Sequence, residues 1–281
     1  MPSWNIHTAH VEHLVESRDP EALGIEDVNA FLFGCYVPDI YVGFMVPDAT
    51  FRVDYCMTHL AMPNLVPVPN ADFFWNRYVV SRLPSTPEGR SLALGAWAHL
   101  LTDRYYNGNF RTFWLTHDVP TGEILRKGKQ GDFDLFGHSL HISSHVEATE
   151  ELVEAAKKFW PYSVLSADVE KAIAVADAIV VDSESMPDNP TYQLLDAEWM
   201  TGVFNACDER TAIWLETWKH LQMQGRDCFA ADVRAFAGLP AATPDDINWQ
   251  NAKEGSRNDS SSAKPMATFT DPNWDSLDPH R

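Results

Sequence analysis

The chain is poor in cysteine and in basic residues. Four cysteines occur in 281 residues, and they are scattered without a CxxC pair. This spacing argues against a disulfide framework or a zinc knuckle and indicates reduced thiols. Lys and Arg number 21 against 40 Asp and Glu, which gives a net charge of −19. Because nucleic-acid binding depends on the neutralisation of phosphates, we expect no nucleic-acid partner.

Long apolar runs are also missing. No uninterrupted apolar stretch reaches the roughly 18 residues that suggest a membrane-spanning helix, so we expect no transmembrane segment. Residues 1–7 contain neither the basic region nor the apolar region of a secretory signal. Together with the reduced thiols, this predicts a cytoplasmic location.

The spacing of the apolar residues predicts an all-α fold. Apolar residues make up 45% of the chain, and no alternating run is long enough to indicate a sheet. Residues 41–70 are expected to form a long packed loop, and residues 126–129 a basic turn. The expected helices cover residues 7–18, 26–33, 71–83, 88–106, 132–145, 149–159, 167–181 and 208–224, with a short turn at 232–238.

The composition changes towards the end of the chain. The change begins at about Pro244, and residues 251–281 are rich in Asn, Ser, Asp, Pro and Lys. Such a segment cannot bury enough apolar surface to offset the entropy lost on ordering. We therefore predict a helical metal-binding domain over residues 1–240 and a flexible tail over residues 241–281.

The expected helix at 88–106 carries a histidine and an aspartate in an apolar setting. His99 and Asp103 are four residues apart, so they share one face of the helix. A buried carboxylate is costly unless it is paired or binds a metal ion. The two side chains are therefore either a hydrogen-bonded pair in the core or part of a metal site.

Other candidate ligands are spread along the first half of the chain. His7 lies on the first expected helix, Asp39 lies on a loop after a proline, and His59 lies in a Thr-His-Leu turn. Asp134 and His138 form a second pair with a spacing of four. Imidazole and carboxylate groups together suit zinc and similar ions. The candidate metal ligands are His7, Asp39, His59, His99, Asp103, Asp134 and His138.

The order of these residues resembles the zinc-dependent phospholipase C family, which is similar in fold and metal layout to the P1-type nucleases. The resemblance covers roughly residues 2–145 and implies a single multi-helix domain with long loops. It implies that Asp39, His59, His99 and Asp103 hold one zinc ion. It further implies that Asp103 bridges towards additional zinc ions, for a total of one to three.

This chain departs from the family pattern at three points. The family uses an N-terminal Trp that binds zinc together with a His like His7, whereas Trp4 is the fourth residue here. The family places a histidine shortly after the HxxxD aspartate, where this chain has Asn109, and His117 is the alternative ligand. The family's later pair is His then Glu, whereas the matched pair here is Asp then His. His141 and His145 form a competing pair with the same spacing.

The resemblance implies a metal-dependent phosphodiester hydrolase that acts on a small-molecule or lipid substrate. Zinc would activate a water molecule, and Asp39 would orient or deprotonate that water as the catalytic residue. A non-catalytic metal-binding or structural module that keeps the fold is the first alternative. An HD-type phosphohydrolase that uses His59 with His117 and Asp118 is the second.

Overall fold

The computed structural model describes residues 2–63, 66–119, 121–183 and 190–240. Within these ranges the chain is all-α, as the sequence predicts, and strand pairing is limited to an isolated bridge between Val42 and Val53. The elements are α1 (Trp4–Ser17), α2 (Val28–Gly34), the 3-10 turn η1 (Val37–Asp39), α3 (Tyr55–Thr58), α4 (Ala71–Phe74), the π-helical segment η2 (Trp75–Val80), α5 (Pro87–Thr116), α6 (Glu123–His138), α7 (Glu150–Lys157), α8 (Ser166–Ser183), α9 (Ala197–Met223) and α10 (Ala230–Ala237).

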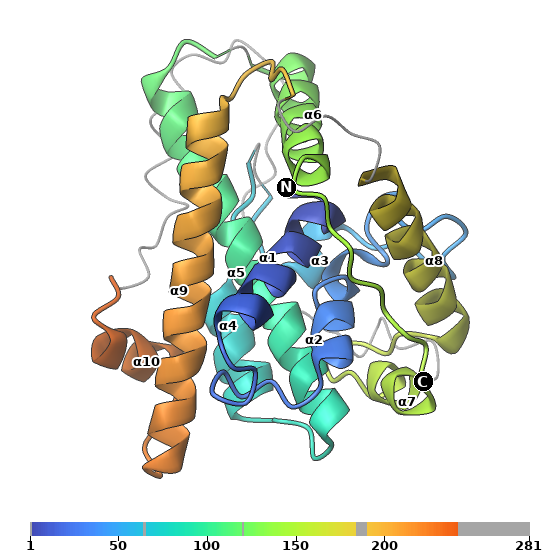
Figure 1. Cartoon of the computed structure of the whole chain (residues 1–281), viewed down its shortest axis with the longest axis vertical. Helices are drawn as coiled ribbons and strands as arrows, with labels where there is room; N and C mark the ends of the chain where they lie inside the picture. Colours follow the sequence, from blue (N-terminus) through green and yellow to red (C-terminus); the bar gives the residue numbers. More distant parts are fainter. Residues whose placement is uncertain (1, 64–65, 120, 184–189, 241–281) are drawn as a thin grey trace.

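Helices α1 and α2 lie at the centre of the molecule, between α9 on one side and α8 on the other (Figure 1). Among the described residues, no helix is both long and apolar enough to cross a membrane. The expected tail over residues 241–281 lies outside the described part of the chain.

Helix α5 is longer than the sequence predicts. It begins at Pro87, where the Thr86 side chain accepts a hydrogen bond from the Gly89 backbone N–H. It then continues ten residues beyond the expected end at residue 106. Phe110 and Trp114 follow at helical spacing and are buried. Their burial outweighs the low helix propensity of the Asn-Gly-Asn segment at residues 107–109.

The prediction for α6 is wrong at both ends. The expected basic turn at residues 126–129 is helical, and the chain leaves the helix after His138 instead of continuing to residue 145. His141 adopts a left-handed backbone conformation with φ of 49°. Such a residue cannot continue a right-handed helix. Gly128 fits within α6 because a Cβ there would lie 2.7 Å from the Leu194 side chain.

Helix α9 also begins earlier than predicted, at Ala197 instead of residue 208. The Asp196 side chain caps it by accepting a hydrogen bond from the Trp199 backbone N–H at 2.7 Å. Met200 and Phe204 in the added turns are buried against other helices. This tertiary contact extends the helix beyond the segment with the clearest pattern.

The apolar core consists of two clusters that meet along α5. The first cluster includes Leu92, Trp97 and Leu101 from the first half of the helix. The second includes Tyr106 and Phe110 from the second half. Helix α1 contributes side chains to both clusters. The face of α5 at the junction of the two clusters carries His99 and Asp103.

Two glycines let α2 cross α5 at backbone contact. A Cβ on Gly95 would lie 2.0 Å from the Phe31 carbonyl oxygen, and one on Gly34 would lie 2.4 Å from the Leu92 carbonyl oxygen. No larger residue fits at either position without moving a helix. The crossing places the carbonyl of Cys35, directly after α2, against α5 one turn beyond Gly95.

Candidate metal centre

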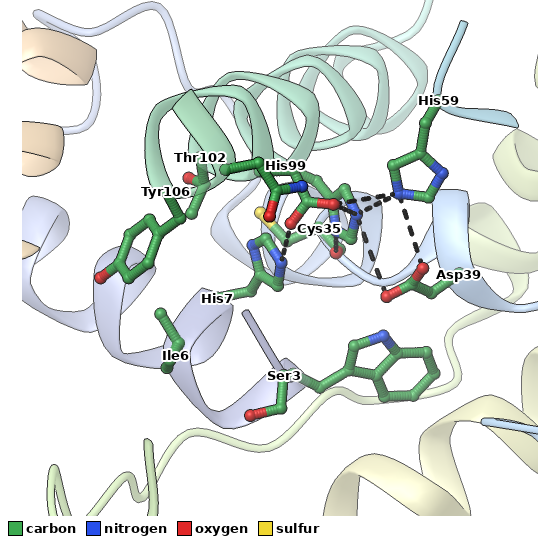
Figure 2. A network of polar contacts seen from close by, with 12 residues as sticks. Ser3, Ile6, His7, Cys35, Asp39, His59, His99, Thr102 and Tyr106 are labelled. Carbon is green, nitrogen blue, oxygen red and sulfur yellow. Dashed lines mark hydrogen bonds and ion pairs between the residues drawn. The ribbon is translucent and has the colours of Figure 1, made fainter. Parts of the chain in front are cut away.

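Five of the seven candidate ligands come together from four separate elements. His99 and Asp103 project from α5, and His7 projects from α1. Asp39 ends the turn η1, and His59 follows the last turn of α3. The side chains of His7, Asp39, His59 and His99 point towards one another (Figure 2).

The ligand atoms form two groups that share His99. Asp39, His59 and His99 make one group, and His7, His99 and Asp103 make the other. The Nε2 atoms of His59 and His99 are 2.9 Å apart. Asp39 Oδ1 lies 3.6 Å from the Nε2 of His59, and Asp39 Oδ2 lies 3.9 Å from that of His99. Asp103 Oδ2 lies 3.4 Å from the first nitrogen and 3.9 Å from the second.

Backbone carbonyls fix the tautomers of the two central histidines. His99 Nδ1 donates to the Cys35 carbonyl at 2.6 Å, and His59 Nδ1 contacts the Tyr55 carbonyl at 3.2 Å and the Thr58 hydroxyl at 2.9 Å. When each Nδ1 donates to its backbone carbonyl, each Nε2 carries a lone pair, and the two Nε2 atoms face each other across 2.9 Å. Such an arrangement is repulsive unless a cation lies between them. A histidine that donates its second nitrogen to a carbonyl is typical of metal ligation.

The residues present fit a zinc ion. Ligand atoms about 2.0–2.1 Å from a tetrahedral zinc ion lie about 3.4 Å from one another. The two Nε2 atoms of His59 and His99 are 2.9 Å apart, and the oxygens of Asp39 and Asp103 lie 3.4 to 3.9 Å from these nitrogens, on both sides of this value. Both oxygens of Asp39 are buried without a hydrogen-bond partner in the described structure, as expected of atoms that bind a cation.

Asp103 faces ligands on both sides. Its Oδ2 atom is directed at His59 and His99, whereas its Oδ1 atom lies 3.5 Å from His7 Nε2. Neither Oδ1 nor His7 Nε2 has a hydrogen-bond partner among the described residues. The His7 ring stacks on the His99 ring at a centroid distance of 4.0 Å. One carboxylate is thus placed to bridge two neighbouring cation positions.

Burial and mutual contact set the charge of the cluster. Burial lowers the pKa of His7 to about 3 and that of His59 well below its usual value, so both rings are neutral at pH 7. Burial raises the pKa of Asp39 to about 6. Burial also opposes ionisation of Asp103, yet the imidazoles around it lower its pKa. Near neutral pH the cluster therefore presents neutral imidazoles and carboxylates, the forms that bind metal ions.

A small cavity of about 10 Å³ adjoins the cluster. His7, Cys35 and Thr102 line its inner side. His10 and Asp208 line the same cavity and contact each other through His10 Nδ1. The cavity has room for about one water molecule beside His7, whose own side chain is almost fully buried.

The structure adds two residues that the sequence analysis did not select. Tyr55 donates from its hydroxyl to Asp103 Oδ2 at 2.8 Å and stacks on the His59 ring. Asn107 is fully buried on α5, one turn after Asp103. Asn107 continues the spacing of four residues that separates His99 from Asp103, so the sequence pattern could have selected it. Tyr55 had no such signal, because its contact joins separate elements.

The remaining candidate ligands belong to neither group. Asp134 is 56% exposed and lies 3.7 Å from His138, so these two residues pair with each other on α6. Asn109 donates to the Tyr105 carbonyl on its own helix at 2.8 Å.

His117 and Asp118 are exposed beyond the end of α5, where His117 Nδ1 contacts the Phe113 carbonyl at 2.9 Å. The ligand set of an HD-type site is therefore not assembled with His59. The competing pair is separated too, because His141 contacts the Ser183 carbonyl and His145 pairs with Asp177.

No protein-family model matches the chain, and neither the curated proteins nor the solved structures contain a match. The zinc-dependent phospholipase C family therefore remains a resemblance carried by these residues, and the functional argument rests on the geometry of the cluster.

Proposed function

We propose that this chain is a metal-dependent phosphodiester hydrolase that resembles the zinc-dependent phospholipases C. The observation that carries the proposal is the convergence of the His59 and His99 Nε2 atoms with the unpartnered oxygens of Asp39. Neutral imidazoles and carboxylates at these separations suit zinc. The ion would be held by Asp39, His59, His99 and Asp103, and His7 with Asp103 Oδ1 offers a second position.

The residues of the cluster have separable roles in such a reaction. A bound zinc ion supplies Lewis acidity and lowers the pKa of a coordinated water to about 7. Asp39 orients the attacking water and accepts its proton, because both of its oxygens are without hydrogen-bond partners. Asp103 holds the geometry through the Tyr55 hydroxyl bond and its contacts with three imidazoles.

One observation favours the alternative of a non-catalytic metal-binding module. The side chains of His59, His99 and Asp103 have no exposed surface, and that of Asp39 is 3% exposed. Four protein ligands around one ion are typical of a closed structural site, whereas a catalytic site keeps an open position. For catalysis, the open position has to be on the His7 side, where the cavity lies.

The test begins with elemental analysis of protein that has been purified without chelator. Wild type is expected to hold about one or more zinc ions per chain, and Asp103→Ala is expected to lose them. Asp134→Ala is the matched control, because this exposed carboxylate lies outside both groups. A wild type that takes up no zinc even after zinc is added would contradict the metal site.

Zinc-loaded wild type is then assayed on phospholipid, nucleotide and aryl phosphodiesters beside Asp39→Ala. Hydrolysis above the Asp39→Ala background supports the hydrolase. If zinc is bound and no substrate of the panel is hydrolysed above that background, the hydrolase proposal is wrong and the non-catalytic metal-binding module is supported instead.

A further inference from the structure

A buried lysine on α6 contacts Asn107, the residue one helical turn after Asp103 on α5, and the proposed reaction gives it no role. Lys129, on α6, is 8% exposed. Its Nζ atom donates to Asn107 Oδ1 at 3.1 Å and lies 5.3 Å from the centroid of the Phe110 ring and 5.7 Å from that of Phe133. Within the described residues, no carboxylate lies at ion-pair distance from it. A buried ammonium group without a counter-ion is costly, so its retention needs a reason.

Asn107 ties this lysine to the metal centre. It follows Asp103 by four residues on α5, so both side chains lie on the same face of the helix. Asn107 Nδ2 donates to the Pro67 carbonyl at 2.8 Å, which directs Oδ1 at the lysine. An amide oxygen orients the ammonium group but does not neutralise its charge.

The position of Lys129 is fixed by the packing of α6. Asp132, one turn later, accepts hydrogen bonds of 2.7 to 2.9 Å from the backbone N–H groups of Gln193, Leu194 and Leu195. Leu194 packs directly over Gly128. These contacts hold the α6 backbone on both sides of Lys129 in place.

Once a divalent cation is bound, the positive charge of Lys129 is not balanced by the charges of the cluster. Two carboxylates, Asp39 and Asp103, balance one divalent ion, and the neutral imidazoles add nothing. Lys129 then contributes one uncompensated positive charge in a buried setting, where electrostatic attraction is strong. Burial lowers the pKa of Lys129 to about 8, so the group is still mostly charged at pH 7. An anion is the partner that this arrangement lacks.

We propose that Lys129, oriented by Asn107, binds an anionic oxygen of a phosphoryl group that also contacts the metal centre. This proposal rests on the proposed function and adds the residue that recognises the substrate's charge. An ammonium group is a common point-charge ligand of phosphate in proteins. The lysine also offsets the repulsion that a chain of net charge −19 exerts on a phosphodiester.

The test measures the binding of inorganic phosphate to the zinc-loaded full-length chain by titration calorimetry at pH 7. Wild type is compared with Lys129→Gln and with Lys127→Gln. Lys127 is the matched control, because it lies on the same helix, is 73% exposed and pairs with Glu123. We expect Lys129→Gln to bind phosphate about tenfold more weakly or worse, with unchanged zinc content, and Lys127→Gln to bind it as wild type does.

Lys129→Met is the second variant, since its side chain keeps the apolar stem between the two phenylalanine rings and removes the charge. Phosphate that binds equally well to folded Lys129 variants overturns the inference, as does zinc-loaded wild type that binds no phosphate. Variants that lose phosphate only because they also lose zinc overturn it too, since Lys129 would then support the metal ligands. The proposed function is tested separately, by the zinc content and the diester hydrolysis of the wild type.

Discussion

At the scale of single residues, the centre of the protein contains polar atoms that the described protein groups do not satisfy. Both oxygens of Asp39, Oδ1 of Asp103 and Nε2 of His7 are buried without a hydrogen-bond partner. Each such atom costs about 1–3 kcal/mol relative to a satisfied one. Several of them within one cluster are destabilising as a protein core, and the same atoms are favourable as ligands of a cation.

Tyr55→Phe is expected to weaken zinc binding about 10- to 100-fold, without unfolding the chain. The tyrosine hydroxyl donates to Asp103 Oδ2, and partners of this kind orient the ligand they contact. Competition with a chromogenic chelator measures the affinity. Tyr105→Phe is the control, since this ring packs against Arg210 instead of the cluster. Equal zinc affinity in both variants would show that the hydroxyl bond does not support the site.

Zinc affinity is expected to fall by up to about tenfold per pH unit as the pH drops below about 6. The cause is Asp39, whose pKa is raised by burial to about 6, so protons compete with the ion below that pH. His7, with a pKa of about 3, adds no competition in this range. Chelator competition from pH 7 to pH 5 measures the slope. An affinity that stays flat across this range would exclude Asp39 as a ligand.

In the absence of metal, the pKa shifts of Asp39 and His7 make folding stability depend on pH in opposite directions. The raised pKa of Asp39 means that the folded state holds its proton up to about pH 6, so this group favours folding at low pH and its contribution is lost as the pH rises. The lowered pKa of His7 favours folding above its usual range near 6.5, and that contribution is lost as the pH falls towards 3.

At the scale of elements, α5 organises the site. It carries two ligands and Asn107, it joins both apolar clusters, and it is crossed by α2 at a contact between glycines. The crossing brings the Cys35 carbonyl to 2.6 Å from His99 Nδ1 and so fixes the orientation of that ligand. The glycines are therefore required by the site as well as by the packing.

Gly95→Ala is expected to destabilise the fold by about 2–4 kcal/mol, because its Cβ would lie 2.0 Å from the Phe31 carbonyl oxygen. Gly108→Ala is the matched control on the same helix. A Cβ there meets nothing within 4 Å, so the change should stabilise the helix by up to about 1 kcal/mol. Urea unfolding of both variants measures the difference. Similar stability in the two variants would mean that the helices separate at little cost.

At the scale of the whole molecule, charge and metal binding act together. A net charge of −19 favours the uptake of divalent cations and opposes the approach of phosphate. The cluster brings two carboxylates into the buried interior, where a cation removes the cost of their burial. Folding and metal binding should therefore be linked.

Removal of zinc by a chelator is expected to lower the melting temperature of wild type by about 5–10 °C. Free zinc at 100 times its dissociation constant stabilises the folded state by about 2.7 kcal/mol, and in a chain of this size each kcal/mol shifts the midpoint by about 2–4 °C. Asp103→Asn should melt at the same temperature with and without zinc. Differential scanning calorimetry measures both, and a wild type that is indifferent to zinc would contradict the linkage.

Local pattern was enough to predict the helical class and the pairing of His99 with Asp103, because helix periodicity depends on neighbours along the chain. Helix ends were predicted less well. Helix α5 extends past its expected end because Phe110 and Trp114 find partners in the second apolar cluster. Lys129, expected in a basic turn, is instead helical and buried. These outcomes depend on contacts between distant segments.

The sequence by itself determined which residues were able to bind a metal ion, since ligand chemistry and i,i+4 spacing are local properties. Tertiary structure decided which of them meet. His99–Asp103 and Asp134–His138 have the same spacing and comparable chemistry, yet the first pair is fully buried and the Asp of the second is 56% exposed. The difference arises because α2 crosses α5 at its glycines and brings other ligands to the first pair, whereas Asp134 lies on an exposed face of α6.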